Sequence, residues 1–403
     1  MAFYRAIETY YKFFIILGTN LGFKFLLNRT CRKNMYSLDM IRKGLVASTL
    51  LIVTSINYTT DVYANAPVQK SAANGKLSAP SIFAQHESGD SVGNKRDSFF
   101  SITSLTQQSK LLTGTRGSLF LVSNDGRFSN INIGSKKNLY SALKLQNSTV
   151  LIGADRGRLY KTDVSLKTFK PIQLKQSEAV FDLLEANDNK VFAVGAYGLF
   201  MSATAPFETW YEEQLPWGVY LKRAWKELGE SLPHLYSSCS SEAGESFVVG
   251  EYGLLLKYEG TKWVKLHGGS IEPALYGCVV SNEGQDIIAV GQKGLVIHSS
   301  DGGLNWESIK LKKEFDLYGI KQVNGVNILI ANYRQLFISK SWKDWFCKRL
   351  KGDDPIGWYI DMLFTNNELV MVGNKGNVKS TPLNFIANVF HSNADVKGFK
   401  SCE

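Results

Sequence analysis

The sequence predicts an all-β fold in which seven similar four-stranded antiparallel sheets surround a common axis. Three observations support this prediction. A pair of glycines recurs between two strand-like apolar runs, the pairs are about forty residues apart, and an aromatic residue follows each pair at a nearly constant distance. Together they indicate one structural unit that is repeated along most of the chain.

The clearest copy of the unit is residues 287–306, IIAVGQKGLVIHSSDGGLNW. One apolar run ends at Gly291, and Gly294 begins a second apolar run after two polar residues. Glycine is favoured where the backbone takes positive φ, and the apolar and β-branched residues on both sides favour strands. The segment therefore predicts a strand, a tight turn, a second strand and a hairpin loop that ends at Trp306.

The same pattern occurs seven times. Its paired positions, in chain order, are Gly114 and Gly117, Gly153 and Gly157, Gly195 and Gly198, Gly250 and Gly253, Gly291 and Gly294, Ala331 and Arg334, and Gly373 and Gly376. The first positions advance by 39 to 42 residues, except for one interval of 55. The aromatic residues that follow are Phe128, Phe169, Trp210, Trp263, Trp306 and Trp345, with Phe385 slightly early in the seventh copy.

A unit of forty residues has room for four short strands, which is the content of one blade of a β-propeller. One such sheet cannot bury both of its faces, but it can do so when it is packed radially between two neighbours. We therefore expect a seven-bladed β-propeller over residues 98–403, with the recurrent Phe and Trp side chains between adjacent blades. Solenoids fit less well, because β-helix repeats are shorter and helical repeats lack the strand-like alternation of residues 254–258.

The long interval predicts an insertion near residues 218–235. Residues 220–230, YLKRAWKELGE, favour a helix, and Pro233 should end it. Insertions in propellers fall on loops, so this helix should cover part of one face. Two roles remain open for it, a local lid on the blade and a docking element for a partner.

The residues before the repeats predict export. Residues 40–64 contain the basic pair Arg42 and Lys43, then an apolar stretch from Gly44 to Ile56 and a small residue, Ala64, at a cleavage-like position, as in a secretory signal peptide. We interpret residues 1–39 as an upstream segment that results from a mis-assigned start, and residues 65–97 as a linker. The alternative is a membrane-associating segment at residues 13–27. We expect a periplasmic or other extracytoplasmic protein.

Charge and cysteine content argue against a nucleic-acid-binding protein and against a metal site. The net charge is +10, but residues 1–64 hold eight Lys and Arg against three acids, so the remainder carries only +5 without a Lys/Arg block. A nucleic acid partner is therefore not expected. After Cys31, the cysteines Cys239, Cys278, Cys347 and Cys402 lack metal-ligand spacing, so we expect no metal site and one or two disulfides of open pairing.

One segment carries a resemblance to a known family. Ser299, Asp301, Gly303 and Trp306 match the Asp-box hairpin, in which the Asp accepts backbone N–H bonds and the Trp packs beneath the turn. A degenerate copy begins at Ser123. Joined to the repeated glycine pairs, this motif resembles the seven-bladed propellers of the photosystem II stability/assembly factor family, over residues 98–390. The resemblance implies a monomeric, non-enzymatic scaffold without a cofactor that docks a membrane-protein partner.

The two residues between the paired glycines should lie on turns that emerge on one face and form a ring. The ring residues with recognition chemistry are Arg116, Arg156, Tyr197, Tyr252, Lys293, Arg334 and Lys375. Arg and Tyr are favoured at interfaces, and a positive ring suits an acidic loop of a protein partner. The alternative is that these side chains only solvate exposed turns. The resemblance also implies an arginine-rich face, which this ring resembles.

Enzymatic functions are less well supported. A glycan-active hydrolase or lyase of the sialidase type would need three arginines, a Tyr nucleophile with its Glu partner, and an acid, on a six-bladed fold. The histidines His86, His234, His267, His298 and His391 are scattered, so no metal site or catalytic residue is predicted. We expect a binding scaffold for a membrane or envelope protein complex. The remaining alternative is an accessory subunit of a membrane transporter. Such a subunit would also be a binding protein, but with a different partner.

Overall fold

The computed structural model describes residues 97–383, apart from residues 188, 242, 271, 282, 312–314, 352–355 and 366–367, and also residues 400–401. These residues belong to one compact unit of the chain, Ile52–Glu403. The predicted upstream segment, the signal peptide and most of the linker lie outside the described residues, as do Cys31, Cys402 and Phe385. Within the described part, no helix is long and apolar enough to cross a membrane.

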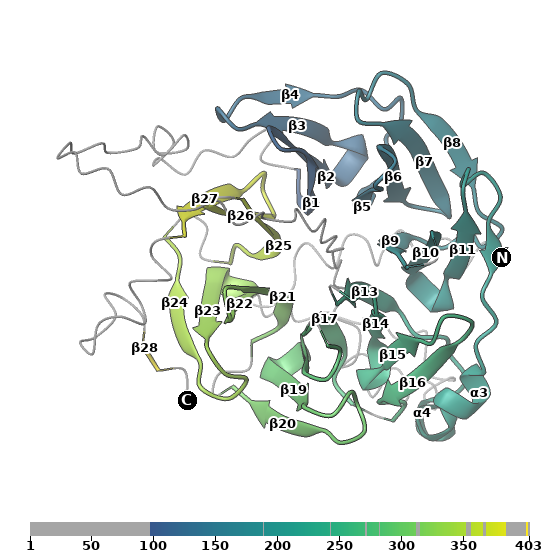
Figure 1. Cartoon of the computed structure of the whole chain (residues 1–403), viewed down its shortest axis with the longest axis vertical. Helices are drawn as coiled ribbons and strands as arrows, with labels where there is room; N and C mark the ends of the chain where they lie inside the picture. The colour runs from purple at the N-terminus through teal and green to yellow at the C-terminus, as the bar shows by residue number, and fades with distance from the viewer. Residues whose placement is uncertain are drawn as a thin grey trace, which may run out of the picture. The chain divides into compact units, whose positions relative to one another are not determined.

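The predicted seven-bladed β-propeller is confirmed, because seven antiparallel sheets stand in chain order around one axis (Figure 1). The four-stranded blades are blade 1 with β1 (Phe99–Thr106), β2 (Ser109–Gly114), β3 (Leu119–Ser123) and β4 (Phe128–Asn130); blade 2 with β5 (Leu139–Lys144), β6 (Thr149–Ala154), β7 (Arg158–Asp163) and β8 (Lys170–Gln173); blade 3 with β9 (Val180–Glu185), β10 (Lys190–Gly195), β11 (Phe200–Thr204) and β12 (Tyr211–Glu212); blade 4 with β13 (Leu235–Ser240), β14 (Ser246–Gly250), β15 (Leu255–Tyr258) and β16 (Trp263–His267); and blade 5 with β17 (Leu275–Val280), β18 (Ile287–Gly291), β19 (Leu295–Ser299) and β20 (Glu307–Lys310).

The last two blades depart from four strands within the described residues. Blade 6 has five, namely β21 (Leu317–Val323), β22 (Val326–Ala331), β23 (Gln335–Ser339), β24 (Phe346–Arg349) and β28 (Lys400–Ser401). Blade 7 has three, namely β25 (Tyr359–Phe364), β26 (Glu368–Gly373) and β27 (Val378–Pro382). The fifth strand of blade 6 is the strand near the end of the chain, which pairs with β24 on the outer edge of that blade.

Apolar side chains fill the seven spaces between adjacent blades. The recurrent aromatic residues lie in these spaces, each with the preceding blade: Phe128 with blade 7, Phe169 with blade 1, Trp210 with blade 2, Trp263 with blade 3, Trp306 with blade 4 and Trp345 with blade 5. In the space between blades 6 and 7, Leu383 takes the corresponding place. The predicted packing is therefore confirmed for every aromatic that the structure describes.

The first strand of every blade contains a bulge that the sequence analysis missed. The unpaired residues are Phe100, Tyr140, Phe181, Tyr236, Tyr276, Tyr318 and Ile360. All seven are buried, and the six aromatic rings follow one another around the axis with neighbouring centroids 5.1–6.3 Å apart. We call these seven buried residues the aromatic collar.

Cysteine pairing is settled for one bridge. Cys239 in β13 and Cys278 in β17 form a disulfide with 5.8 Å between their Cα atoms. Both residues are fully buried, so the bridge links the inner strands of blades 4 and 5 inside the core. Cys347 is also disulfide-bonded.

The predicted insertion is helical but shorter than expected. It forms α3 (Trp217–Tyr220) and α4 (Lys222–Leu228), which lie beside β16 at the rim of the disc (Figure 1). The second helix ends at Gly229, whose φ of 86° breaks the helical conformation before Pro233 is reached. The helices pack on blade 4, since Leu221 and Ala224 are fully buried and the Tyr220 hydroxyl donates to Trp263 O at 2.8 Å.

Candidate functional site

The turns between the second and third strands share one face of the disc, because strand direction alternates identically in every blade. The connections between blades lie on the same face, here called the turn face. The turn of blade 1 is held at two points that exclude a side chain. A Cβ at Gly114 would lie 2.4 Å from Ser98 O, and one at Gly117, whose φ is +77°, would lie 1.9 Å from Ser135 O. The glycine pair thus lets the turn contact both its own blade and the entry to the next.

The residue before the second glycine has left-handed backbone geometry in every blade. These seven structurally equivalent residues, the turn ring, are Arg116, Arg156, Tyr197, Tyr252, Lys293, Tyr333 and Lys375, with φ between 49° and 61°. Such a conformation costs a non-glycine residue free energy unless the surroundings hold it. The ring therefore depends on contacts from the neighbouring blade.

Those contacts recur around the disc. The Arg116 N–H donates to Asn138 Oδ1 at 3.1 Å, and the Lys293 N–H donates to Asp316 Oδ1 at 3.1 Å. The Tyr197 N–H points to His234 Nδ1 at 3.3 Å. Each acceptor belongs to the connection that enters the next blade. The ring is therefore fixed in place by its neighbours.

The structure corrects the sixth member of the predicted ring. Arg334 occupies the place of the second glycine, with φ of 57°, and is only 6% exposed. Tyr333 is the equivalent of Arg116 and is 43% exposed. The ring therefore has four basic residues and three tyrosines, where five and two were predicted. The error came from aligning the degenerate copy on its glycine positions.

A similar offset occurs in blade 2. Leu139 pairs with Ala154 as Phe99 pairs with Gly114, so Ala154, and not Gly153, takes the first glycine position. Arg156 still precedes the second glycine and keeps its predicted place.

Exposure differs around the ring. Arg116, Arg156, Lys293 and Lys375 are exposed, and Tyr197 is 61% exposed. Tyr252 is half-buried, because the insertion covers it and its hydroxyl is hydrogen-bonded with Ser231. Six of the seven residues are thus presented to a partner, and Tyr252 supports the insertion.

Four acidic side chains next to the ring, Asp97, Asp155, Glu251 and Asp316, are engaged within the fold. Asp155 accepts hydrogen bonds from the Tyr140 hydroxyl at 2.7 Å and the Asn138 N–H at 3.1 Å, and Asp97 pairs with Arg116. Burial raises the pKa of the Glu251 and Asp316 carboxyls. Because these carboxylates are occupied within the fold, the exposed charge of the ring is positive.

Three basic residues, Lys137, Arg156 and Arg158, lie near one another beside blade 2. The pKa of Lys137 is lowered, first by burial and then by the charges of Arg156 and Arg158 nearby. The buried Arg158 Nε has no hydrogen-bond partner within the described structure. Like charges held together in this way favour a bound anion that would neutralise them.

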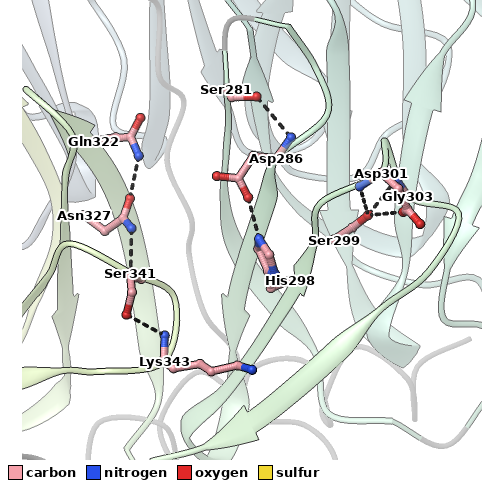
Figure 2. Close-up of polar contacts among 10 residues, drawn as sticks. All are labelled: Ser281, Asp286, His298, Ser299, Asp301, Gly303, Gln322, Asn327, Ser341 and Lys343. Atoms are coloured by element: carbon pink, nitrogen blue, oxygen red, sulfur yellow. Dashed lines mark hydrogen bonds and ion pairs between the residues drawn. The ribbon is translucent and has the colours of Figure 1, made fainter.

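The Ser299–Trp306 turn lies on the opposite side of blade 5 from the turn ring, at the β19–β20 loop (Figure 2). Asp301 Oδ1 accepts the Asn305 N–H at 2.9 Å, and the Ser299 hydroxyl accepts the Gly303 N–H at 2.8 Å. The Trp306 ring N–H donates to Gly303 O at 3.1 Å. The hydrogen bonds from Asn305 lower the pKa of Asp301 to about 2. Its carboxylate ties a turn and faces no candidate substrate site.

The described histidines have separate structural partners. His234 lies beneath Tyr197 with ring centroids 4.5 Å apart, and burial lowers its pKa to about 4. His267 contacts Gly253 O at 2.9 Å. His298 contacts Asp286 (Figure 2) and also stacks on Trp342. Among the described residues, no group of three His, Cys, Asp or Glu side chains could hold a metal ion.

Two acids lie near the axis, where an enzyme of this architecture would place its chemistry. Asp182 accepts the Ser238 N–H at 2.7 Å, and Asp361 accepts the Ile102 N–H at 2.8 Å. Both are fully buried, and the Lys321 ammonium lies 3.9 Å from Asp361. A cavity of about 10 Å³ beside Lys321 has room for about one water molecule. These acids therefore join blades and are closed to a glycan.

Comparisons with known proteins support the fold. No family model and no curated protein matches the chain. Among solved structures, YCF48 from Cyanidioschyzon merolae has a TM-score of 0.59 and 11% identity, covering 73% of this chain and 97% of its own. YCF48 bound to D1 peptide has a TM-score of 0.56 and 13% identity, covering 73% of this chain and 94% of its own. The extracellular domain of a putative hybrid two-component system from B. thetaiotaomicron has a TM-score of 0.56 and 10% identity, covering 76% of this chain and 41% of its own. At these identities the likeness shows a shared propeller fold.

Proposed function

We propose that the chain is an exported, monomeric, non-enzymatic scaffold whose turn face binds an acidic segment of a membrane or envelope protein complex. The observation that carries this proposal is the turn ring, in which basic and Tyr side chains are exposed while the neighbouring acids are turned inward. Arg, Lys and Tyr fixed on rigid turns give a partner's carboxylates charge-assisted hydrogen bonds without a large ordering cost.

Further support comes from the comparison with YCF48, one structure of which is bound to D1 peptide. The sequence resemblance to photosystem II stability/assembly factors points to the same class of client, a membrane-protein segment. We assign the Ser299–Trp306 turn to the Asp-box type with a structural role. The buried Cys239–Cys278 disulfide supports an extracytoplasmic location, because such bonds persist in oxidising compartments.

The glycan-active hydrolase has no comparable support. Asp182 and Asp361, the acids near the axis, are buried and accept backbone N–H groups of other blades. An accessory transporter subunit would use the same turn face, so only the identity of the client separates it from the proposed function.

The proposal is tested by partner recovery from solubilised membranes with the full chain as bait. A variant with Arg116→Glu, Arg156→Glu and Lys293→Glu should lose the partner that the wild type retains, and wild-type recovery should fall with added salt. The matched control replaces Arg127 and Lys343, two exposed residues away from the ring, by Glu and should retain the partner. Equal recovery by both variants, with unchanged thermal melting, would remove the turn ring from the binding site.

A further inference from the structure

Exposed apolar side chains gather on the turn face at blades 3 and 4. Tyr197 in the turn ring is 61% exposed, and Leu232 of the insertion is 36% exposed beside it, since a Cβ at Gly198 would lie 3.0 Å from the Leu232 side chain. Tyr197 and Leu232 form what we call the apolar sector.

The apolar sector rests on a fixed base. The Lys265 ammonium donates to Tyr220 O at 3.1 Å, and the Ala224 N–H donates to Gly269 O at 3.3 Å. The Trp225 ring N–H donates to Ser231 O at 2.8 Å, which fixes the segment that leads to Leu232. A binding surface that is already ordered loses little conformational entropy when a partner docks.

The apolar sector adjoins the basic residues of blade 2. Gly157, which follows Arg156, donates its N–H to Glu178 O at 2.5 Å in the connection that enters blade 3. The same connection contacts the strand after Tyr197, because the Phe200 N–H donates to Gln176 Oε1 at 3.0 Å. A ligand that leaves the Arg156 and Arg158 side chains toward blade 3 therefore meets Tyr197 and Leu232 next.

We propose that the turn face has two adjoining subsites and binds a polypeptide segment in which acidic residues are followed by aromatic or aliphatic residues. The acidic part lies on Arg156, Arg158 and Lys137, and the apolar part lies on the apolar sector. This inference rests on the proposed function, of which it specifies the ligand.

The charges of the insertion favour a polypeptide over a lipid surface. Exposed Lys222, Arg223 and Lys226 are interspersed with exposed Glu227 and Glu230, so the insertion offers little net attraction to anionic headgroups. Blade 2 instead offers the exposed Arg156 and the half-buried Arg158, whose planar guanidinium groups match individual carboxylates.

The test measures fluorescence anisotropy with labelled synthetic peptides and the full chain. One peptide carries four Asp or Glu followed by Phe and Leu, and a second replaces Phe and Leu by Ser. Tyr197→Ser with Leu232→Ser should weaken the first peptide about ten-fold, in the range of an interface anchor, and leave the second unchanged. Leu304→Ser is the control, because Leu304 is 83% exposed on the β19–β20 loop and lies outside the turn face.

The other outcomes of the peptide experiment separate failure of the apolar sector from failure of the proposed function. If Arg156→Glu with Arg158→Glu weakens both peptides but the Tyr197 and Leu232 variant binds both like the wild type, the apolar sector is not a subsite and the proposed function stands. If the arginine variant also binds like the wild type, the proposed function fails. If the protein sediments with phosphatidylglycerol vesicles and needs Tyr197 and Leu232 to do so, the ligand of the apolar sector is a lipid surface and not a polypeptide.

Discussion

Asp361 in the first strand of blade 7 accepts the backbone N–H of Ile102 in the first strand of blade 1 at 2.8 Å. This contact closes the ring of blades together with the apolar side chains between blades 7 and 1 and the Gly376 N–H, which donates to Asp97 O at 2.8 Å. Among the described residues, closure therefore depends on side chains and single hydrogen bonds, since no sheet contains strands from both ends of the propeller.

Replacing Asp361 should open this closure. Asp361→Ala leaves the Ile102 N–H without an acceptor and Lys321 without its closest buried counter-charge, so we expect a loss of roughly 3–5 kcal/mol in the free energy of unfolding. Chemical denaturation followed by tryptophan fluorescence measures this loss. Asp361→Asn with Lys321→Met is the comparison variant: it removes the ion pair and keeps one of the two acceptors, so its loss should be smaller than that of Asp361→Ala. A loss below about 1 kcal/mol for Asp361→Ala would contradict the assigned role.

The inner disulfide should stabilise the propeller. Cys239 and Cys278 are separated by 39 residues, and replacing both by Ala should lower the free energy of unfolding by about 3–4 kcal/mol through the greater freedom of the unfolded chain. Because both sulfurs are buried, dithiothreitol should not reduce the bridge in the native protein at low concentration. The check is melting of variant and wild type with and without reductant. Equal melting of the two under oxidising conditions would show that the bridge adds no stability.

The blade number and the inter-blade aromatics follow from the sequence because glycine turns and large rings recur at a fixed spacing. Such local patterns show where each blade lies along the chain, one blade at a time. The aromatic collar was within reach of the same analysis, since the residue at the bulged position of the first strand is aromatic in six of the seven blades. It was missed because the bulge that turns those rings toward one another is a property of strand pairing.

The candidate site was also predicted only in part from the sequence. Six ring members were placed correctly from spacing alone, whereas Tyr333 was missed because Arg334 takes a left-handed conformation that normally requires glycine. The neighbouring acids are held by side-chain contacts within or next to their own blade, as between Asp155 and the Tyr140 hydroxyl. The positive sign of the ring was predicted from the sequence, whereas the inward orientation of these acids is not reported by any spacing rule.

Asp301 should stabilise the fold in a way that depends on pH in the acid range. It should not contribute to binding. Hydrogen bonds from Asn305 hold its pKa at about 2, below that of a free Asp, so the contribution is full above about pH 4 and disappears as the pH falls toward 2. Asp301→Ala should therefore melt earlier than the wild type at pH 6 and at nearly the same temperature at pH 2. Binding of the acidic–apolar peptide at pH 7 should be unchanged. A constant melting difference across this range would show that the carboxylate charge is not what ties the turn.

His234 should make the turn face sensitive to mild acid. Burial lowers its pKa to about 4, below the value of about 6.5 in an unfolded chain, so the unfolded state binds the extra proton between these values. Stability should therefore fall as the pH drops from about 6.5 to 4, and protonation of Nδ1 would also remove the acceptor that faces the Tyr197 N–H. His234→Gln should flatten the pH dependence of melting over this window, whereas the control His267→Gln should retain it. If the two variants follow the same curve as the wild type, His234 does not govern the acid response, and the loss of stability must come from other groups.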